Sequence, residues 1–135
     1  MKTTLCGIRL RNPVIAASGT FAYGVEFLEI TNVEAIGAFV VKGISRQPME
    51  GNPPPRIWEA EAGMINSIGL QNIGVEAFVR DKLPRLRELG VTVVANMFGF
   101  TVEEYAAVAS RLDAEPGIAA LEVNISCPNV KEGGI

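Results

Sequence analysis

A cysteine with the potential for chemistry lies near the end of the chain, in the run N-I-S-C-P-N over residues 124–129. Cys127 follows an apolar run at residues 118–123 and precedes Pro128, which lacks the amide hydrogen that a strand ladder needs. The thiol is therefore expected on a loop just past a strand. A thiol has a reference pKa of about 8.5, and a neighbouring lysine or backbone amides lower it toward neutrality. A thiolate placed there can act as a nucleophile or as a base, and the spacing alone favours neither role.

Histidine, the usual base near neutral pH, is absent from the sequence. Proton transfer within this stretch therefore falls to Cys, Lys, Asp, Glu or Tyr. The two cysteines, Cys6 and Cys127, fit no zinc or haem spacing and indicate no disulfide framework, so no metal site is expected. Cys6 falls in a predicted hairpin and is interpreted as a packed small side chain.

Small and polar residues follow each of the apolar runs that predict strands. They form four clusters, at residues 17–20, 41–43, 95–99 and 123–127. In a parallel α/β protein the active site lies at the carboxyl ends of the strands. The side chains expected on that one face are Ser18, Lys42, Asn96 and Asn124. Amide and hydroxyl groups with one cation suit a flat polar heterocycle or a phosphate-bearing cofactor.

Each of these residues has a plainer interpretation when it is taken alone. A single lysine is more often a solvated surface residue, an asparagine can cap the helix that follows it, and Ser18-Gly19 is a common turn. A lone cysteine is usually a small buried side chain, and residues 66–70 alone form a loop. The recurrence of polar residues at the same end of successive strands favours a site, but it names no reaction.

The composition limits the class of protein. The 135 residues are 48% hydrophobic and 20% charged with a net charge of −3, which is typical of one globular domain. No basic patch indicates nucleic-acid binding, and no apolar run reaches the ~18 residues of a membrane span. The N-terminus lacks the apolar stretch of a signal peptide. A cytoplasmic protein with no nucleic-acid or membrane partner is expected.

Apolar runs predict the strands that must position these residues. Four strands are expected, at residues 14–17, 38–41, 91–95 and 118–123. A short hairpin that turns near Gly7 is expected from residues 3–6 and 8–11. Unbroken apolar runs are typical of strands buried on both faces, as in a parallel sheet covered by helices.

Three helices are expected between the strands. Residues 25–32 predict a modest helix, and residues 101–112 predict one that opens with the capping pattern T-V-E-E. Residues 73–89 have apolar side chains at helical spacing around Pro84, which predicts a kink or two consecutive helices. The Pro-rich residues 47–57 are interpreted as a long strand-to-helix loop, where functional residues concentrate.

The order of these elements is an α/β pattern. A closed (β/α)8 TIM barrel needs eight strands and about 250 residues. The chain is therefore expected to supply an N-terminal hairpin and about the first four βα units of a barrel. A doubly wound domain of 135 residues is the alternative.

Six motifs in register resemble one enzyme family: N-P-V-I-A-A-S-G-T-F, V-V-K-G-I-S, G-N-P-P-P-R, N-S-I-G-L-Q-N, N-M-F-G-F and N-I-S-C-P-N-V-K. Together they closely resemble the N-terminal half of class 1 dihydroorotate dehydrogenases. The runs I-S-C-P-N-V-K-E-G-G and G-N-P-P-P-R-I-W-E are most similar to the class 1B branch. The resemblance implies that residues 1–135 are the N-terminal half of a single FMN-binding (β/α)8 barrel domain. It also implies oxidation of dihydroorotate to orotate in pyrimidine (UMP) synthesis.

The resemblance implies a role for each matching residue. Cys127 matches the base that removes a proton from C5 of dihydroorotate while hydride leaves C6 for N5 of the flavin; class 2 members resemble this chain but carry serine as the base. Lys42 matches a lysine that contacts both flavin and substrate, and its cation can balance the substrate carboxylate and charge on the reduced flavin. The other implied flavin contacts are Ala17, Ser18, Gly43, Asn96 and Asn124. The other implied substrate contacts are Asn66, Ser67, Ile68, Gly69, Leu70, Asn124 and Asn129.

The 1B resemblance also implies partners. The catalytic subunit is expected to form a homodimer and to pair, as a heterotetramer, with a second subunit that carries FAD and an iron–sulfur cluster and passes electrons to NAD. A further lysine, phosphate-binding loops and the closing strands of the barrel are missing from the 135 residues. The sequence is therefore interpreted as part of a longer chain.

Two other kinds of function stay open. Related flavoenzymes use the same scaffold, such as a class 1A dihydroorotate dehydrogenase that reduces fumarate or the pyrimidine-reducing domain of dihydropyrimidine dehydrogenase. Assays with different electron acceptors separate these. A non-catalytic flavin- or nucleotide-binding half barrel is the third hypothesis. The presence of Cys127 and Lys42 argues against it, because binding alone does not require a thiol.

Overall fold

A four-stranded parallel sheet forms the centre of the fold in the computed structural model, which describes residues 1–125. Its strands lie in the order β3 (Ile15–Ala16), β4 (Ala38–Val40), β7 (Val93–Met97) and β8 (Ile118–Val123). Each neighbouring pair is parallel. The four predicted strands are confirmed, and their carboxyl ends point toward one edge.

The order of the strands distinguishes between the two predicted architectures. The strands lie side by side in the order in which they occur along the chain. A doubly wound sheet reverses its direction at a switch point, whereas a barrel adds each strand on the same side of the previous one. The sheet therefore has the topology expected for consecutive strands of an α/β barrel.

The two inner strands hold the centre of the hydrophobic core. All three residues of β4 are buried, and the side chain of Phe39 is 0% exposed. The rest of the core comes mainly from the segment after β4, from β7 and from the helices that cover the sheet. Its largest members besides Phe39 are Phe78, Ile44, Leu83, Leu86, Met97 and Leu112. Burial of one such side chain contributes about 1.5–3 kcal/mol, so apolar packing of helices on the sheet is the main source of stability.

One long helix follows the excursion after β4, and a wide turn interrupts it. It consists of α1 (Val75–Ala77), the π-helical segment η3 (Phe78–Lys82) and α2 (Leu83–Leu89). The amide of Leu83 donates to the carbonyl of Phe78, five residues earlier, directly before Pro84 in the first turn of α2. A proline cannot donate the next helical hydrogen bond and crowds the preceding turn, and the wider π turn accommodates it. The predicted consecutive helices are thus two α-helical segments that a π segment joins.

Helix α3 (Val102–Asp113) packs beside β7 and β8, with Tyr105, Val108 and Leu112 buried. The Oγ1 atom of Thr101 accepts a hydrogen bond from the amide of Glu104, as the capping pattern predicts. The carboxylate of Glu104 accepts from the amide of Phe100 at 2.8 Å, one residue earlier than in a standard capping box.

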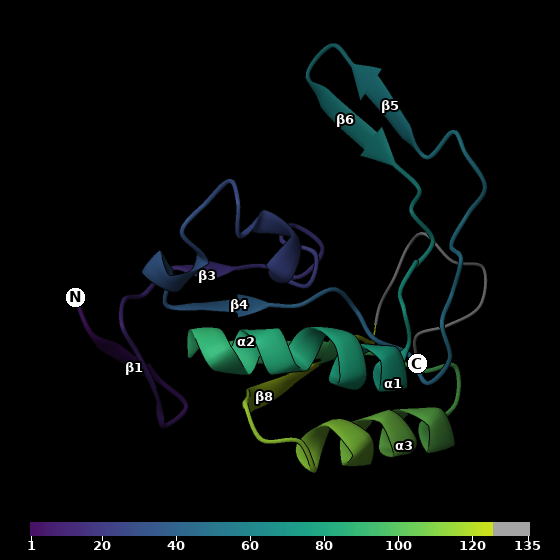
Figure 1. Cartoon of the computed structure of the whole chain (residues 1–135). Coiled ribbons are helices and arrows are strands. Elements are labelled where there is room, and N and C mark those ends of the chain that lie inside the picture. Colours follow the sequence, from purple (N-terminus) through teal and green to yellow (C-terminus); the bar gives the residue numbers. More distant parts are fainter. Residues whose placement is uncertain (126–135) are drawn as a thin grey trace.

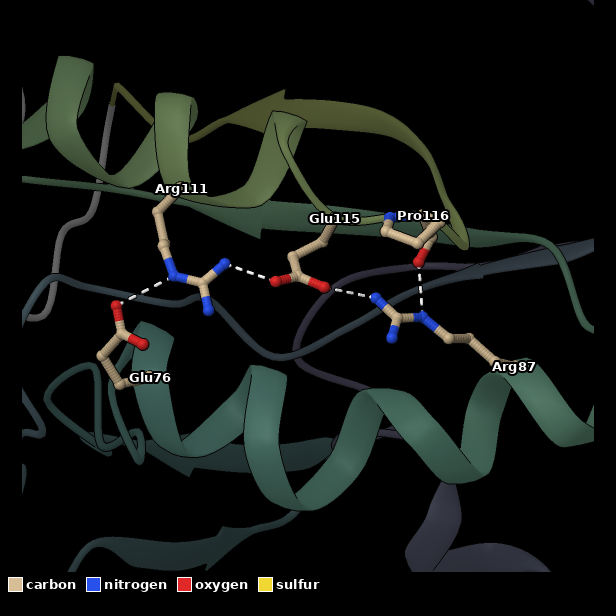
Figure 2. A network of polar contacts seen from close by, with 5 residues as sticks. All are labelled: Glu76, Arg87, Arg111, Glu115 and Pro116. Carbon is tan, nitrogen blue, oxygen red and sulfur yellow. Dashed lines mark hydrogen bonds and ion pairs between the residues drawn. The ribbon is translucent and has the colours of Figure 1, made fainter.

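A network of charged residues links α1 and α2 to α3 and the turn after it, as Figure 2 shows. The guanidinium of Arg111 on α3 donates to Glu76 on α1 at 3.0 Å and to Glu115 at 2.5 Å. Arg87 on α2 donates to the same Glu115 and to the carbonyl of Pro116. The bonds from Arg111 and then Arg87 hold the pKa of Glu115 below its usual value. This network ties α1 and α2 to the turn that follows α3.

The N-terminal hairpin is confirmed as β1 (Thr3–Leu5) paired antiparallel with β2 (Ile8–Leu10). Cys6 and Gly7 form its turn with φ values of 46° and 82°, as a two-residue hairpin requires. The interpretation of Cys6 as a packed side chain is wrong, because its position in this turn leaves it exposed.

The predicted helix over residues 25–32 is also wrong. The segment forms the short 3-10 helix η1 (Val25–Phe27), and a second one, η2 (Val33–Ala35), follows it. No residue of η1 is buried. Because a helix in a protein is stabilised mainly by a buried apolar face, this segment has little to extend it beyond one turn.

The excursion between β4 and α1 contains a hairpin that the sequence did not predict. Strand β5 (Ile57–Ala60) pairs antiparallel with β6 (Gly63–Asn66), and all eight residues are exposed. Figure 1 shows this hairpin standing away from the sheet and the helices, while β1 lies near the opposite end of the molecule. The predicted loop is confirmed over residues 47–56, which lie outside the helices and strands, and β5 begins at its last predicted residue, Ile57.

Candidate functional site

The carboxyl ends of β3, β7 and β8 surround a hollow of about 440 Å³, which we call the Asn96 hollow. Its lining residues are Ser18, Asn96, Glu122, Val123, Asn124 and Ile125. Three of the four side chains expected at the strand ends therefore lie together. Among residues 1–125, no group of three or more His, Cys, Asp or Glu side chains is arranged to hold a metal ion.

Asn96 is the most constrained polar group of this hollow, because it is only 4% exposed. Its Nδ2 atom donates to Oε1 of Glu122 at 2.6 Å. An ionised carboxylate can only accept, so the amide nitrogen of Asn96 must face Glu122. The Oδ1 atom of Asn96 is then left buried without a hydrogen-bond partner. A buried acceptor of this kind costs about 1–3 kcal/mol unless a ligand supplies a donor.

Gly43 has no side chain, and this leaves room for Oδ1 of Asn96. A Cβ atom on Gly43 would lie 2.8 Å from Oδ1 of Asn96, so a side chain there would collide with the amide. The neighbouring backbone is held firmly, since the amide of Ile44 donates to the carbonyl of Asn96 and the amide of Phe98 donates to the carbonyl of Ile44. The segment after β4 thus continues along β7 and keeps Gly43 close to Asn96.

The other residues predicted at the strand ends have backbone contacts. The Oγ atom of Ser18 donates to the carbonyl of Val41 at 3.4 Å, and the carbonyl of Ala17 accepts from Oγ1 of Thr20 at 2.7 Å. The amide of Asn124 donates to the carbonyl of Met97, which extends the pairing of β7 with β8. These contacts define the ends of the strands and place Ser18 and Asn124 at the rim of the Asn96 hollow.

Lys42 lines a second hollow, of about 480 Å³, which we call the Lys42 hollow. The other residues that line it are Tyr23, Pro48, Met49, Glu50, Gln71, Asn72 and Ile73. Burial raises the pKa of Tyr23. The hydrogen bond from the amide of Ile73 lowers this pKa and the charge of Glu26 raises it, but both effects are smaller than that of burial. Tyr23 is therefore a neutral phenol at neutral pH. Lys42 lines this hollow, and its neighbour Gly43 lies against Asn96, which lines the other one.

The loop over residues 66–70, which includes Asn66, Ser67, Ile68, Gly69 and Leu70, lines neither of these two hollows. It begins at the last residue of β6 and is held against the loop segment that precedes β5. Asn52 donates from Nδ2 to Oγ of Ser67 at 2.8 Å and from its amide to the carbonyl of Ile68 at 3.1 Å. The close fit continues at Gly69, where a Cβ atom would lie 2.6 Å from the amide nitrogen of Asn52.

Two predicted residues, Cys127 and Asn129, lie outside the described residues. Two side chains of structural importance to the site were missed. Glu122 lies on β8, two residues before Asn124 just past the end of the strand, and the alternation of side chains along an extended segment places both on one face. Asn72 is the last residue of the motif N-S-I-G-L-Q-N. Both signals were present in the sequence.

The dihydroorotate dehydrogenase family model matches residues 1–135. A protein of Solibacter usitatus with the provisional name dihydroorotate dehydrogenase A (fumarate) is 60% identical over 100% of this chain and 44% of its own length. The catalytic subunits of dihydroorotate dehydrogenase B (NAD(+)) from Trichlorobacter lovleyi and Geobacter sulfurreducens are each 58% identical, with the same coverage. The chain thus spans less than half the length of these relatives.

A solved structure is similar in fold. The crystal structure of DHODH in complex with ferulenol from Eimeria tenella matches with a TM-score of 0.73 at 22% identity, over 96% of this chain and 38% of that one. The parallel sheet and its helices therefore correspond to a portion of that structure. The chain belongs to the dihydroorotate dehydrogenase family, and it has the fold of the N-terminal portion of the family's α/β barrel.

Proposed function

We propose that this chain belongs to the catalytic subunit of a dihydroorotate dehydrogenase that oxidises dihydroorotate to orotate in pyrimidine synthesis. One observation carries the proposal. In a chain of this family, the buried acceptor Oδ1 of Asn96 lies without a donor over Gly43, at the carboxyl ends of parallel strands. That edge is where ligands bind in α/β barrels.

The described residues fit a flavin, and we propose FMN. The residues that would hold it are Ala17, Ser18, Lys42, Gly43, Asn96 and Asn124. Bound FMN would supply the acceptor for hydride in this reaction. Asn96 offers Oδ1 to an N–H donor, since Glu122 keeps its amide nitrogen occupied. Gly43 lets the Asn96 side chain lie close to the backbone, because a Cβ atom on Gly43 would lie 2.8 Å from Oδ1 of Asn96.

We further propose that the substrate meets three parts of the chain. The cation of Lys42 balances the substrate carboxylate, and the 66–70 loop with Asn66 and the more distal Asn129 recognises the pyrimidine edge. Cys127 accepts the proton from C5 on its Sγ atom, which requires the thiolate form. The roles of Cys127 and Asn129 rest on the motif N-I-S-C-P-N alone.

The choice of electron acceptor and of partner is part of this proposal. Relatives named for the fumarate-linked type and for the NAD(+)-linked type match at nearly equal identity, 60% and 58%. The runs I-S-C-P-N-V-K-E-G-G and G-N-P-P-P-R-I-W-E favour the NAD-linked 1B type. On that basis we propose a cytoplasmic homodimer that pairs with a subunit carrying FAD and an iron–sulfur cluster. No helix among residues 1–125 is long and apolar enough to cross a membrane.

Anaerobic mixing of the purified full-length protein with dihydroorotate tests the proposal. Rapid bleaching of the flavin absorbance is expected. A yellow protein that dihydroorotate does not bleach would refute the substrate, and a protein that stays colourless with added FMN would refute the cofactor. Turnover with NAD in the presence of the partner subunit, compared with turnover on fumarate without it, then separates the two types.

A further inference from the structure

Asn72 occupies a junction between the 66–70 loop, the segment that carries Lys42 and the start of α1. The residue is 5% exposed and lines the Lys42 hollow. Its backbone forms a bridge with Met49, in which each amide donates to the carbonyl of the other residue. A buried polar side chain at such a junction must find partners for both ends of its amide.

The side chain of Asn72 binds the chain on either side of Asn72 itself, at Leu70 and Gly74, and also Ser45, which is 27 residues away. Its Oδ1 atom accepts from the amide of Ser45 at 3.2 Å and from the amide of Gly74, just before α1, at 2.8 Å. Its Nδ2 atom donates to the carbonyl of Leu70 at 2.9 Å and to Oγ of Ser45 at 2.8 Å. All four polar positions of the amide are thus directed to specific partners.

The contact with Leu70 supports an unusual backbone conformation. Leu70 has a φ of 57°, which a residue with a side chain rarely adopts, and Gly69 before it has a φ of 74°. A loop in this conformation needs contacts that hold it in place. The hydrogen bond from Asn72 to the carbonyl of Leu70 is one such contact at the end of the loop.

The contact with Ser45 links the loop to the Lys42 segment. Ser45 lies three residues after Lys42, and its carbonyl accepts from the amide of Val75. Ile44, next to Ser45, is bound to the backbone of Asn96. The side chain of Asn72 therefore fixes the 66–70 loop relative to a segment that the sheet itself holds.

We propose that Asn72 is a positioning residue for the substrate: it sets the 66–70 loop relative to Lys42, so that the loop binds the pyrimidine edge while the cation binds the carboxylate of the same substrate molecule. This inference rests on the proposed function. Asn72 acts through Leu70 and Ser45, and it leaves the Asn96 hollow unaffected because it does not line it. Loss of Asn72 therefore weakens substrate binding far more than flavin binding or the rate at saturating substrate.

The test uses the full-length flavoprotein in parent form and as Asn72→Ala, Asn72→Asp and Asn32→Ala. Three quantities are measured: the FMN content, the Kd for orotate from the perturbation of the flavin spectrum, and the dependence of anaerobic flavin reduction on dihydroorotate concentration. Asn32→Ala is the control, because Asn32 is exposed, its Oδ1 accepts from the amide of Glu34, and it lines neither of the two hollows.

Asn72→Ala is expected to keep its FMN and to bind orotate with a Kd about tenfold higher, equivalent to about 1.4 kcal/mol. At saturating dihydroorotate, its flavin is expected to be reduced at nearly the parental rate. Asn72→Asp keeps the acceptor for Ser45 and Gly74 but places an oxygen against the carbonyl of Leu70. It is expected to fold like the parent and still to bind orotate more weakly. Asn32→Ala is expected to match the parent.

The outcomes separate this inference from the proposed function. A parent protein that neither binds orotate nor is reduced by dihydroorotate overturns both. A normal parent with an unchanged orotate Kd in Asn72→Ala overturns the inference alone. If Asn72→Ala fails to fold, the orotate Kd of Asn72→Asp tests the positioning role instead. A Kd equal to that of the parent in this variant contradicts that role.

Discussion

The central sheet and the excursion between β4 and α1 are stabilised in different ways. Strand β4 is buried along its whole length, and the core packs around Phe39. The β5–β6 hairpin within the excursion is exposed along its whole length, and Trp58 is 70% exposed. The loops beside the hairpin are held by the amides of Asn52 and Asn72.

Because of this difference, the two regions position different residues of the candidate site in different ways. The sheet places Gly43 and Asn96 through backbone pairing and apolar packing, which leave little freedom. The excursion places the 66–70 loop through a few hydrogen bonds, which permit local movement at small free-energy cost. The flavin is thus expected to meet the rigid part and the substrate the adjustable part. The predictions below test that division.

The largest effect is expected from the core. Phe39→Ala in the full-length protein should lower the free energy of unfolding by about 3–5 kcal/mol, because the ring is fully buried and the cavity cannot close completely. Urea unfolding measures the change. The matched control is Phe100→Ala, since Phe100 is 45% exposed and should lose much less. Equal losses in the two variants would contradict the assignment of the core.

A smaller effect is expected at the flavin side of the site. Glu122→Ala removes the acceptor for Nδ2 of Asn96, so the amide is no longer held with Oδ1 free for a ligand. A hydrogen bond to a charged group contributes about 1.5–3 kcal/mol, so FMN is expected to dissociate roughly tenfold more readily. Equilibrium dialysis with flavin fluorescence measures this. Glu122→Gln, which can still accept, should retain more FMN than Glu122→Ala, and the reverse order would refute the explanation.

A pH-dependent effect is expected in the network of Figure 2. The pKa of Glu115 is lowered from 4.5 by Arg111 and Arg87, so the folded state binds a proton at this site less readily than the unfolded state. The stabilisation is therefore fully present above the unfolded pKa and is lost as the pH falls through the folded pKa. Glu115→Gln should flatten the fall in the unfolding free energy below pH 4.5.

Chemical denaturation at a series of pH values checks this prediction. The control is Glu61→Gln, an exposed glutamate in the turn of the β5–β6 hairpin, outside the network. An acid dependence of Glu115→Gln identical to that of the parent would show that the network adds nothing to stability.

The smallest effect is expected on the exposed hairpin. Trp58→Ser should change the free energy of unfolding by no more than about 0.5 kcal/mol, because the side chain is largely in solvent. The same urea experiment measures it. A loss comparable to that of Phe39→Ala would show that another part of the assembled protein covers the hairpin, and the contrast between the two regions would then fail.

The predicted elements succeeded where the signal is local. The apolar runs at 38–41 and 91–95 are strands because both faces are buried, and T-V-E-E begins a helix because its side chains cap the amides next to it. The helix predicted over residues 25–32 was wrong, because weak helical spacing without a buried apolar face does not stabilise a helix. The β5–β6 hairpin escaped notice because its eight residues are exposed on both faces and show no clear alternation.

The sequence by itself determined the α/β architecture, the edge of the sheet where polar residues gather, and the motifs of the dihydroorotate dehydrogenase family. These follow from spacing within a few residues of each other. Only the tertiary structure decided that Lys42 and Asn96 line different hollows, that Glu122 orients Asn96, and that Asn72 joins the 66–70 loop to Ser45. The physical reason is that a hydrogen bond between residues 26 or 27 positions apart depends on how β4, β7, β8 and α1 pack, and no local pattern encodes that packing.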